Sequence, residues 1–386
     1  AGTSNVRLGV NAGDSIASNA ARNVCVGDEA GTAINSGTDN VAIGFEALHD
    51  NTTGVGNVAI GFRAADLSNA SFSVAIGYNT LGANTSGDSN IGVGTNALGS
   101  NDDGGSNVAV GRDCLITNSS GDNNVAMGRN ALNQATTADN NTSIGTDSGR
   151  FVTTASGSTF VGTNAAKGIT GAKLTGDNNT AIGESAGLLL QGTGNHNTLL
   201  GFEVGDNITT GDSNQMFGIN LSCSAATADN NIVIGSNITG AGPGTVRIGK
   251  ASGEATLSLD GSDTSWAAAS DSRLKKDVAD STVGLEFIKD LRPVTFKWNA
   301  KNAVANSLPQ YNADSSDPVY GEGKAHHGFI AQEVKAVIDS HSDVVNGHNL
   351  WSEDPNGTQQ VAPSALVPML VKAIQELEAR IATLEG

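Results

Sequence analysis

Small and apolar residues return along the first two thirds of the chain in a five-residue pattern that ends in glycine. The pattern is Asn or Ser, two small or β-branched residues, an aliphatic residue and Gly, as in NVAIG at 40–44 and NVAVG at 107–111. With its weaker copies it occurs fifteen times, and nine of the fourteen steps are 17 residues long. The closing glycines are Gly9, Gly27, Gly44, Gly61, Gly77, Gly94, Gly111, Gly128, Gly145, Gly162, Gly183, Gly201, Gly218, Gly235 and Gly249. A fixed period of this kind is the signature of a repeat architecture.

Each repeat is too short to bury its apolar face alone, so successive repeats must stack. The alternation in VAIG predicts a half-buried strand with Val and Ile inward and Ala outward, followed by a corner at the glycine. Segments such as FEAL at 45–48 predict a second short strand, and stretches such as GDNN at 121–124 predict turns. We therefore expect a mainly β fold, a parallel β-solenoid or β-roll shaft of about fifteen 17-residue rungs. Its length would be roughly 70 Å at the usual strand spacing.

The NVAIGxxA pattern resembles the head repeats of trimeric autotransporter adhesins over residues 5–249. That resemblance implies a left-handed parallel β-roll that is stable only as a trimer. The composition favours association independently, because only 16 of 386 residues are aromatic and a thin single-chain roll has little core. A second apolar face shared between chains would supply the missing burial. We therefore expect a homotrimer.

The turns contain recurrent aspartates that admit two interpretations. These residues are Asp88, Asp122, Asp139, Asp177, Asp212 and Asp229. One interpretation is a ladder of calcium sites. The repeats lack the alternating Gly-x-Asp pattern of calcium-binding solenoids, so turn capping is favoured and no metal or cofactor is expected. The polar loops are interpreted either as a surface for a glycan or protein receptor or as a solvated spacer, and no single rung stands out.

The composition changes near residue 250, since every proline lies at 243 or later and all three tryptophans follow residue 260. We expect a repetitive shaft at 1–250, a connector at 251–269 and a smaller α/β domain at 270–386. The last segment, from about Pro363, predicts a helix with a coiled-coil seam, although an ordinary amphipathic helix is the alternative. The seam residues are Leu366, Leu370, Ile374, Leu377, Ile381 and Leu384, and the flanking Glu376, Glu378 and Arg380 suit pairing between chains.

Three segments of this C-terminal region resemble the intramolecular chaperone domain of phage tailspikes and fibres, a self-cleaving family first recognised in endosialidases. They are SDSRLKK at 270–276, HGFIAQEV at 327–334 and LVPMLVKAIQELEARIATLE at 366–385. The resemblance implies a domain that trimerises the fibre during folding and then cuts itself off before the serine of its first motif. It assigns Ser270 as the nucleophile, Lys275 as its partner, the Ala269–Ser270 bond as the cleavage point, and Asp271, Arg273 and His327 as supporting residues. Gln332 and Glu333 also match the family, and for His327 a packing role is the stronger alternative.

This chemistry is reasonable from the residues themselves. A serine hydroxyl needs a base to take its proton, and a lysine serves as one when desolvation or nearby cations such as Arg273 and Lys276 lower its pKa. The five-residue spacing places Ser270 and Lys275 together neither on a strand nor on one helix face, so they would meet in a turn or across subunits. The alternative is that SDSRLKK merely caps a helix.

Charge and cysteine content exclude several classes of protein. The chain carries 39 acidic and 21 basic residues, a net charge of −18, which disfavours nucleic acid as a partner. The sequence holds no apolar run long enough to span a bilayer, so membrane insertion is not expected. Cys25, Cys114 and Cys223 are far apart and odd in number, and we expect each to be a small buried residue without a disulfide.

Together these features predict the distal part of a bacteriophage tail fibre or spike, located in the virion tail after assembly in the host cytoplasm. Near-identical rungs permit register slips between chains, which explains the need for a chaperone that aligns them. The only catalysis expected is a single-turnover serine autoproteolysis with a Ser/Lys dyad. The alternatives are a bacterial trimeric surface adhesin, a glycan-degrading tailspike with a carboxylate pair, and a membrane-tethered transcription factor, for which basic and transmembrane regions are missing.

Overall fold

The structure is a computed structural model that describes residues 4–251, 253–259, 267–268, 272, 275–306, 308, 310–320, 323–344, 349–354 and 357–385. The chain divides into two compact units, residues 1–269 and 270–386. None of the helices in the described ranges is long and apolar enough to cross a lipid bilayer.

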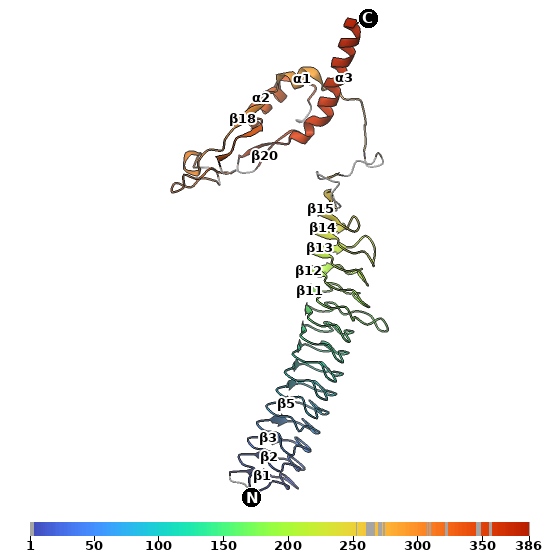
Figure 1. The fold of residues 1–386 in the computed structure, drawn as a ribbon, viewed down its shortest axis with the longest axis vertical. Coiled ribbons are helices and arrows are strands. Elements are labelled where there is room, and N and C mark those ends of the chain that lie inside the picture. The colour runs from blue at the N-terminus through green and yellow to red at the C-terminus, as the bar shows by residue number, and fades with distance from the viewer. Residues whose placement is uncertain are drawn as a thin grey trace. The chain divides into compact units, whose positions relative to one another are not determined.

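The first unit is built on a parallel β-solenoid in which each repeat is one rung (Figure 1). Each rung contributes one strand, and the strand pairs in parallel with that of the next repeat, so that Val41 lies opposite Val58 and Ile43 opposite Ile60. The strands are β1 (Val6–Leu8), β2 (Val24–Val26), β3 (Val41–Ile43), β4 (Val58–Ile60), β5 (Val74–Ile76), β6 (Ile91–Val93), β7 (Val108–Val110), β8 (Val125–Met127), β9 (Thr142–Ile144), β10 (Thr159–Val161), β11 (Thr180–Ile182), β12 (Thr198–Val204), β13 (Gln215–Ser222), β14 (Ile232–Thr239) and β15 (Thr245–Lys250). The prediction of a mainly β solenoid with 17-residue rungs is confirmed.

The solenoid ends in a short antiparallel segment. Strand β16 (Gly253–Ser258) pairs with β15 in antiparallel fashion, and β17 (Ala267–Ala268) pairs with β16 in the same way. The rung pattern therefore stops at β15, where the 17-residue repeat also stops in the sequence.

The faces of the strands are the reverse of the predicted ones. Ala42 and Ala109, at the centres of β3 and β7, are fully buried, whereas Ile43 and Ile76 are 36% and 38% exposed. In several rungs a leucine such as Leu98, which is also fully buried, fills the interior opposite the strand. Because close-packed interiors have little spare volume, only a small side chain fits opposite such a leucine. The larger Val and Ile side chains therefore point outward.

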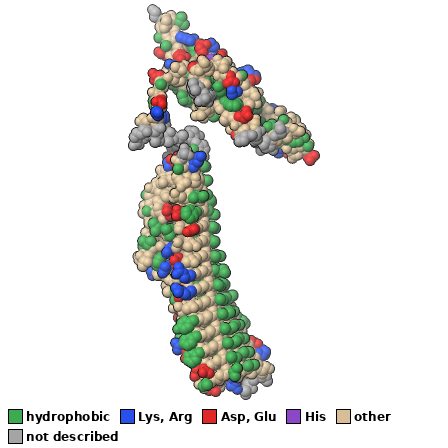
Figure 2. Space-filling view, turned by 180° about the vertical axis from the view of Figure 1, so that it is seen from behind, with side chains coloured by type: hydrophobic (Ala, Val, Ile, Leu, Met, Phe, Trp, Pro, Cys, Tyr) green, Lys and Arg blue, Asp and Glu red, His purple; other side chains and the backbone are tan. Residues whose placement is uncertain are grey.

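The outward position just before each corner glycine is apolar in every rung. We call this row the outer apolar column, and its members are Leu8, Val26, Ile43, Ile60, Ile76, Val93, Val110, Met127, Ile144, Val161, Ile182, Leu200, Phe217, Ile234 and Ile248. Figure 2 shows continuous rows of hydrophobic side chains along the shaft. A contiguous apolar surface of this length is characteristic of an interface with another molecule.

The corner glycines adopt a conformation that other residues rarely reach. Gly94, for example, has φ +128°, and a Cβ placed on it would lie 2.8 Å from the carbonyl oxygen of Gly111 in the next rung. Glycine is therefore needed both for the positive φ and for the close stacking of successive corners.

A second short strand was predicted after each corner. In the rungs of β1 to β11 this segment is not a strand. Its second and fourth residues are left-handed, as for Glu46 with φ 52° and Leu48 with φ 53°. Their backbone N–H groups still bond to adjacent rungs: that of Glu46 donates to the Asp28 carbonyl at 3.1 Å and that of Leu48 to the Ala64 carbonyl at 2.8 Å. Alternating left-handed residues thus give a tight, hydrogen-bonded turn segment, whereas β12 to β15 continue as strands through the glycine.

The polar residue that opens each repeat forms a buried ladder along the solenoid. The backbone N–H of Asn107 donates to Asn90 Oδ1 at 2.9 Å, and Asn107 Nδ2 donates to the Gly121 carbonyl at 2.7 Å. Asn107 Oδ1 in turn accepts the backbone N–H of Asn124 at 2.9 Å and its Nδ2 at 3.0 Å. Each asparagine therefore ties its own rung to the rungs on both sides and satisfies buried backbone groups.

Replacing Asn107 by Leu is expected to lower the free energy of unfolding by about 1–3 kcal/mol, because the buried N–H of Asn124 loses its acceptor. The measurement is thermal and denaturant unfolding followed by circular dichroism. Asn107→Ser is the matched control with a smaller expected loss, since Ser73 occupies this position in its own rung and its Oγ accepts the N–H of Asn90 at 3.2 Å. If both variants lost the same free energy of unfolding, the proposed role of the ladder in stability would be contradicted.

The second unit is a small α/β assembly that ends in a long helix, as predicted. Its helices are α1 (Leu285–Asp290), α2 (Ala331–Ser340) and α3 (Leu366–Glu385), with 3-10 turns at Lys301–Ala303 and Pro363–Ala365. Its strands form two antiparallel pairs, β18 (Val294–Phe296) with β19 (His326–Gly328) and β20 (Trp351–Glu353) with β21 (Gln359–Val361). Phe287 of α1, Val334 of α2 and Met369 of α3 are buried together in its core.

Candidate functional site

The predicted cleavage segment is described only in part. Ala269, Ser270, Asp271 and Arg273 lie outside the described residues. Lys275 is exposed, outside any helix or strand, and its backbone N–H donates to the Ser272 carbonyl at 3.2 Å. The pairing of Ser270 with Lys275 stays a prediction.

The two adjacent histidines of β19 have different environments. His327 is exposed and lies opposite Thr295 of β18 in the strand pairing. His326 is half-buried and packs against Phe296, with ring centroids 5.7 Å apart, and against Trp298 at 6.4 Å. His326 is thus the packed histidine, whereas His327 is exposed and lacks the packing role that was the stronger expectation for it.

The second sequence motif anchors the start of α2. Glu333 accepts a hydrogen bond from Arg292 Nε at 2.9 Å, and a second contact joins its other oxygen to the same guanidinium. This pairing holds the pKa of the Glu333 carboxyl below its usual value and raises that of Arg292. The pair links α2 to the segment between α1 and β18, so the matching glutamate has a structural role in this unit.

The final helix carries an uncovered apolar seam. Leu366 and the neighbouring Met369 are buried within the unit, whereas Leu370, Leu377 and Ile374, the last 64% exposed, are not covered by it. Ile381 and Leu384 continue this exposed row to the end of the helix. The predicted seam is therefore available for contact with other chains.

The polar flanks of this helix differ from the prediction, because two of the three residues expected to pair between chains have partners within the chain. Glu376 accepts the backbone N–H of Leu285 at 2.9 Å, at the start of α1. Arg380 lies 3.4 Å from a carboxylate oxygen of Glu286. These contacts hold α3 against α1, whereas the apolar row stays exposed.

A cavity of about 800 Å³ lies beside the β18–β19 pair. Its walls include Trp298 and Tyr320, whose rings meet edge to face with centroids 4.9 Å apart, together with Ile330 and Gln332. No carboxylate is among the described residues that line it. The cavity thus does not provide the carboxylate pair that glycoside hydrolysis uses.

The turn aspartates of the shaft cap backbone groups of the preceding rung. Asp122 Oδ1 accepts the N–H of Gly105 at 2.6 Å, and Asp139 Oδ1 accepts the N–H of Asp122 at 2.7 Å. Asp88, Asp177, Asp212 and Asp229 make the equivalent bonds at 2.7–2.8 Å. The turn-capping interpretation is confirmed, and within the described residues no cluster of side chains suits a metal ion.

The three cysteines are buried and free, as predicted. Burial raises the pKa of the Cys25 thiol to about 11 and those of Cys114 and Cys223 to about 12. At neutral pH these thiols are therefore protonated and act as small apolar side chains.

Comparison with known proteins bears on the region that follows the shaft. Residues 270–343 match the family model described as chaperone of endosialidase. The match begins at Ser270, the first residue of the second unit. With the β-solenoid it supports an endosialidase-type chaperone at the C-terminal end of a solenoid shaft, and residues 270–386 are accordingly called the chaperone unit. No curated protein and no solved structure matches the chain.

A second apolar face was expected from the sequence, but the residues of the outer apolar column were assigned to the interior instead. A signal for their outward position was present, because the central strand residue is small in most repeats, as in Ala42, Cys25 and Gly92, whereas its neighbours are large. Small residues at a fixed repeat position indicate a narrow interior. The large residues beside them must then face outward.

Proposed function

We propose that this chain is the distal part of a bacteriophage tail fibre or tailspike that attaches the virion to a host surface receptor. Three copies of the shaft pack side by side, and the chaperone unit aligns them and then separates itself by autocleavage. In the mature virion the shaft belongs to the tail, outside the host cell.

The outer apolar column is the main observation in support of a trimer. In an assembly with a rotation axis parallel to the shaft, each residue near the axis meets its own equivalents in the other chains. A column that is apolar in every rung fits such an arrangement, because no rung then places a polar group in the interface. The apolar row of α3 offers the same chains a second contact in the chaperone unit.

The need for a chaperone follows from the regularity of the column. Sliding one chain by one 17-residue rung brings each column residue against another apolar residue, so the energetic cost of a slip is small. A unit outside the repeat, which assembles before the shafts do, fixes the correct alignment. Its removal afterwards leaves a trimer whose dissociation is limited by the rate of unfolding.

The proposed cleavage proceeds by acyl transfer. Lys275 takes the proton of the Ser270 hydroxyl, and the Oγ attacks the carbonyl carbon of Ala269. The C–N bond breaks, the Ser270 nitrogen receives a proton, and an ester joins Ala269 to Ser270 Oγ. Water then hydrolyses this ester, which leaves a carboxylate on Ala269 and restores the Ser270 hydroxyl.

The oligomeric state tests the assembly part of the proposal. We expect the full chain, kept uncut by Ser270→Ala, to have a mass in solution of three times its 38.8 kDa, measured by light scattering after gel filtration. Wild type should give a shaft trimer with the same number of chains after cleavage. A monodisperse, folded monomer in both samples would overturn the proposal.

A further inference from the structure

A second column of side chains runs beside the outer apolar column, formed by the residue that follows each corner glycine. We call it the post-glycine column, and its members are Val10, Asp28, Phe45, Phe62, Tyr78, Thr95, Arg112, Arg129, Thr146, Thr163, Glu184, Phe202, Ile219, Ser236 and Lys250. Several rungs carry a charged residue here, among them Asp28, Arg112 and Glu184. All three of these charged residues are exposed. The post-glycine column is therefore a solvent-facing surface.

Three consecutive rungs place aromatic residues in this column. Phe45, Phe62 and Tyr78 are 43%, 42% and 55% exposed. Their rings are nearly parallel, with interplanar angles of 20° and 5° and centroids 5.4 and 5.2 Å apart. These separations are those of offset stacking, so each ring is displaced from the next and part of it stays uncovered. In Figure 2 a shorter group of hydrophobic side chains lies beside the long rows, toward the N-terminal end of the shaft.

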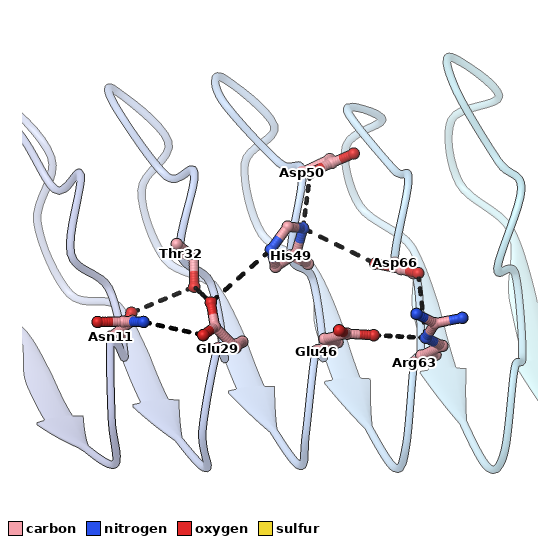
Figure 3. A network of polar contacts seen from close by, with 8 residues as sticks. All are labelled: Asn11, Glu29, Thr32, Glu46, His49, Asp50, Arg63 and Asp66. Atoms are coloured by element: carbon pink, nitrogen blue, oxygen red, sulfur yellow. Dashed lines mark hydrogen bonds and ion pairs between the residues drawn. The ribbon is translucent and has the colours of Figure 1, made fainter.

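Polar side chains of both charges border this aromatic group on the same rungs. Figure 3 shows Glu46 and Arg63 paired across adjacent rungs, with Asp66 on the other side of the guanidinium at 3.7 Å. The Arg63 guanidinium also lies 5.7 Å from the centre of the Phe62 ring. Aromatic rings are thus adjacent to fixed hydrogen-bonding groups.

The same network continues to a histidine and further carboxylates. His49 Nδ1 contacts Asp50 at 2.6 Å, and its ring nitrogens lie 4.0 Å from oxygens of Glu29 and Asp66 (Figure 3). Burial raises the pKa of the Asp66 carboxyl. Besides Glu46, which pairs with Arg63, the network holds three carboxylates, those of Glu29, Asp50 and Asp66. Their oxygens are acceptors for a ligand with several hydroxyl groups.

We propose that Phe45, Phe62 and Tyr78, with the bordering Glu46, Arg63 and Asp66, bind a neutral oligosaccharide that lies along the shaft. A pyranose ring has one apolar C–H face, which stacks on an aromatic ring, and peripheral hydroxyl groups, which bond to carboxylates and guanidinium groups. A row of three rings on successive rungs suits consecutive sugar units of a chain. This proposal rests on the attachment role proposed above and gives that role a location.

Charge and size favour this ligand over the other classes. The border contains more carboxylates than cations, so sialylated or phosphorylated glycans would be repelled. A protein partner generally needs a contact of about 800 Å² on each side, considerably more than three partly exposed rings supply. The site therefore fits a neutral glycan best.

The test uses full-length wild-type protein on an array of neutral oligosaccharides of hexose and N-acetylhexosamine units, printed beside sialylated and phosphorylated ones. We expect binding to at least one neutral oligosaccharide, and a loss of affinity of at least about tenfold in Phe62→Ala, since a central aromatic ring dominates such contacts. Tyr78→Phe, which keeps the ring, should remain within a few-fold of wild type. Phe202→Ala is the matched control, because Phe202 is a similarly exposed aromatic of the same column whose neighbours there are Glu184 and Ile219.

Three results would overturn the site: no binding to any neutral oligosaccharide, binding restricted to anionic ones, or equal binding by Phe62→Ala. Chain number and cleavage are measured on the same samples. A cleaved trimer without neutral-glycan binding would contradict this site alone, whereas a monomer would contradict the assembly proposal. The proposed glycan site lies on the surface of a single chain. The array result therefore tests the site whether the protein is a monomer or a trimer.

Discussion

Ser270→Ala is expected to leave the chain uncut, because the substitution removes the only oxygen that the proposed acyl transfer uses as its nucleophile. Intact mass under denaturing conditions should show two wild-type fragments that meet between Ala269 and Ser270, and only the full-length chain for the variant. Since the reaction happens once per chain, the expected difference is between complete and absent cleavage.

Two further variants distinguish catalysis from folding. Lys275→Ala should slow cleavage by about 10² to 10⁴, the usual contribution of a general base. Ser272→Ala, two residues from the nucleophile, should cut like wild type. If Ser270→Ala and wild type both stay full length in a folded trimer, the proposed nucleophile is wrong, and the chaperone unit is a permanent trimerisation cap.

The repeat was predictable because it depends on local rules that every rung obeys. Glycine at a fixed position, a period of 17 residues and short β-branched stretches specify a stack of parallel strands, and Gly94 shows why the corner excludes other residues. Turn capping by the aspartates was predictable because the repeats lack the Gly-x-Asp pattern of calcium-binding solenoids. Where a rung carries the aspartate, its carboxylate accepts the equivalent backbone N–H of the preceding rung.

Alternation alone could not predict which face of each strand points to the interior. Alternation states that Ala42 lies on one face and Val41 with Ile43 on the other, but both faces of this strand are apolar. The usual rule places the larger residues inside, and it fails here because the narrow interior already holds leucines such as Leu48. The choice between the faces depends on the width of the rung, which is a tertiary property.

In the chaperone unit, too, some features could be predicted from sequence spacing and others could not. The final helix α3 and its exposed row through Ile374 follow from heptad spacing. The partners of Glu376 and Arg380 do not, because the N–H of Leu285 and the carboxylate of Glu286 lie about 90 residues away in sequence. Contacts of that separation arise from the packing of α1 on α3, which sequence spacing does not specify.

The second large effect is expected from charges placed on the outer apolar column. Ile144→Asp combined with Val161→Asp puts two carboxylates per chain into the proposed interface, and each would lie near its own equivalents on the trimer axis. Burying an unpaired charge costs several kcal/mol per ion. We expect the shaft of this variant to lose its trimeric state in light scattering and to melt far below wild type.

The matched control carries the same charges on the same two rungs. Thr146→Asp with Thr163→Asp changes the post-glycine column, two residues further along each repeat, where other rungs already carry Asp28 or Glu184. This variant should remain trimeric and melt close to wild type, because surface substitutions away from an interface usually change stability by less than about 0.5 kcal/mol. If both variants remain trimeric with equal stability, the column does not form the interface. If only the first dissociates, the outward Val and Ile face is the surface on which three chains meet, and the apolar residues that one rung cannot bury alone are buried by assembly.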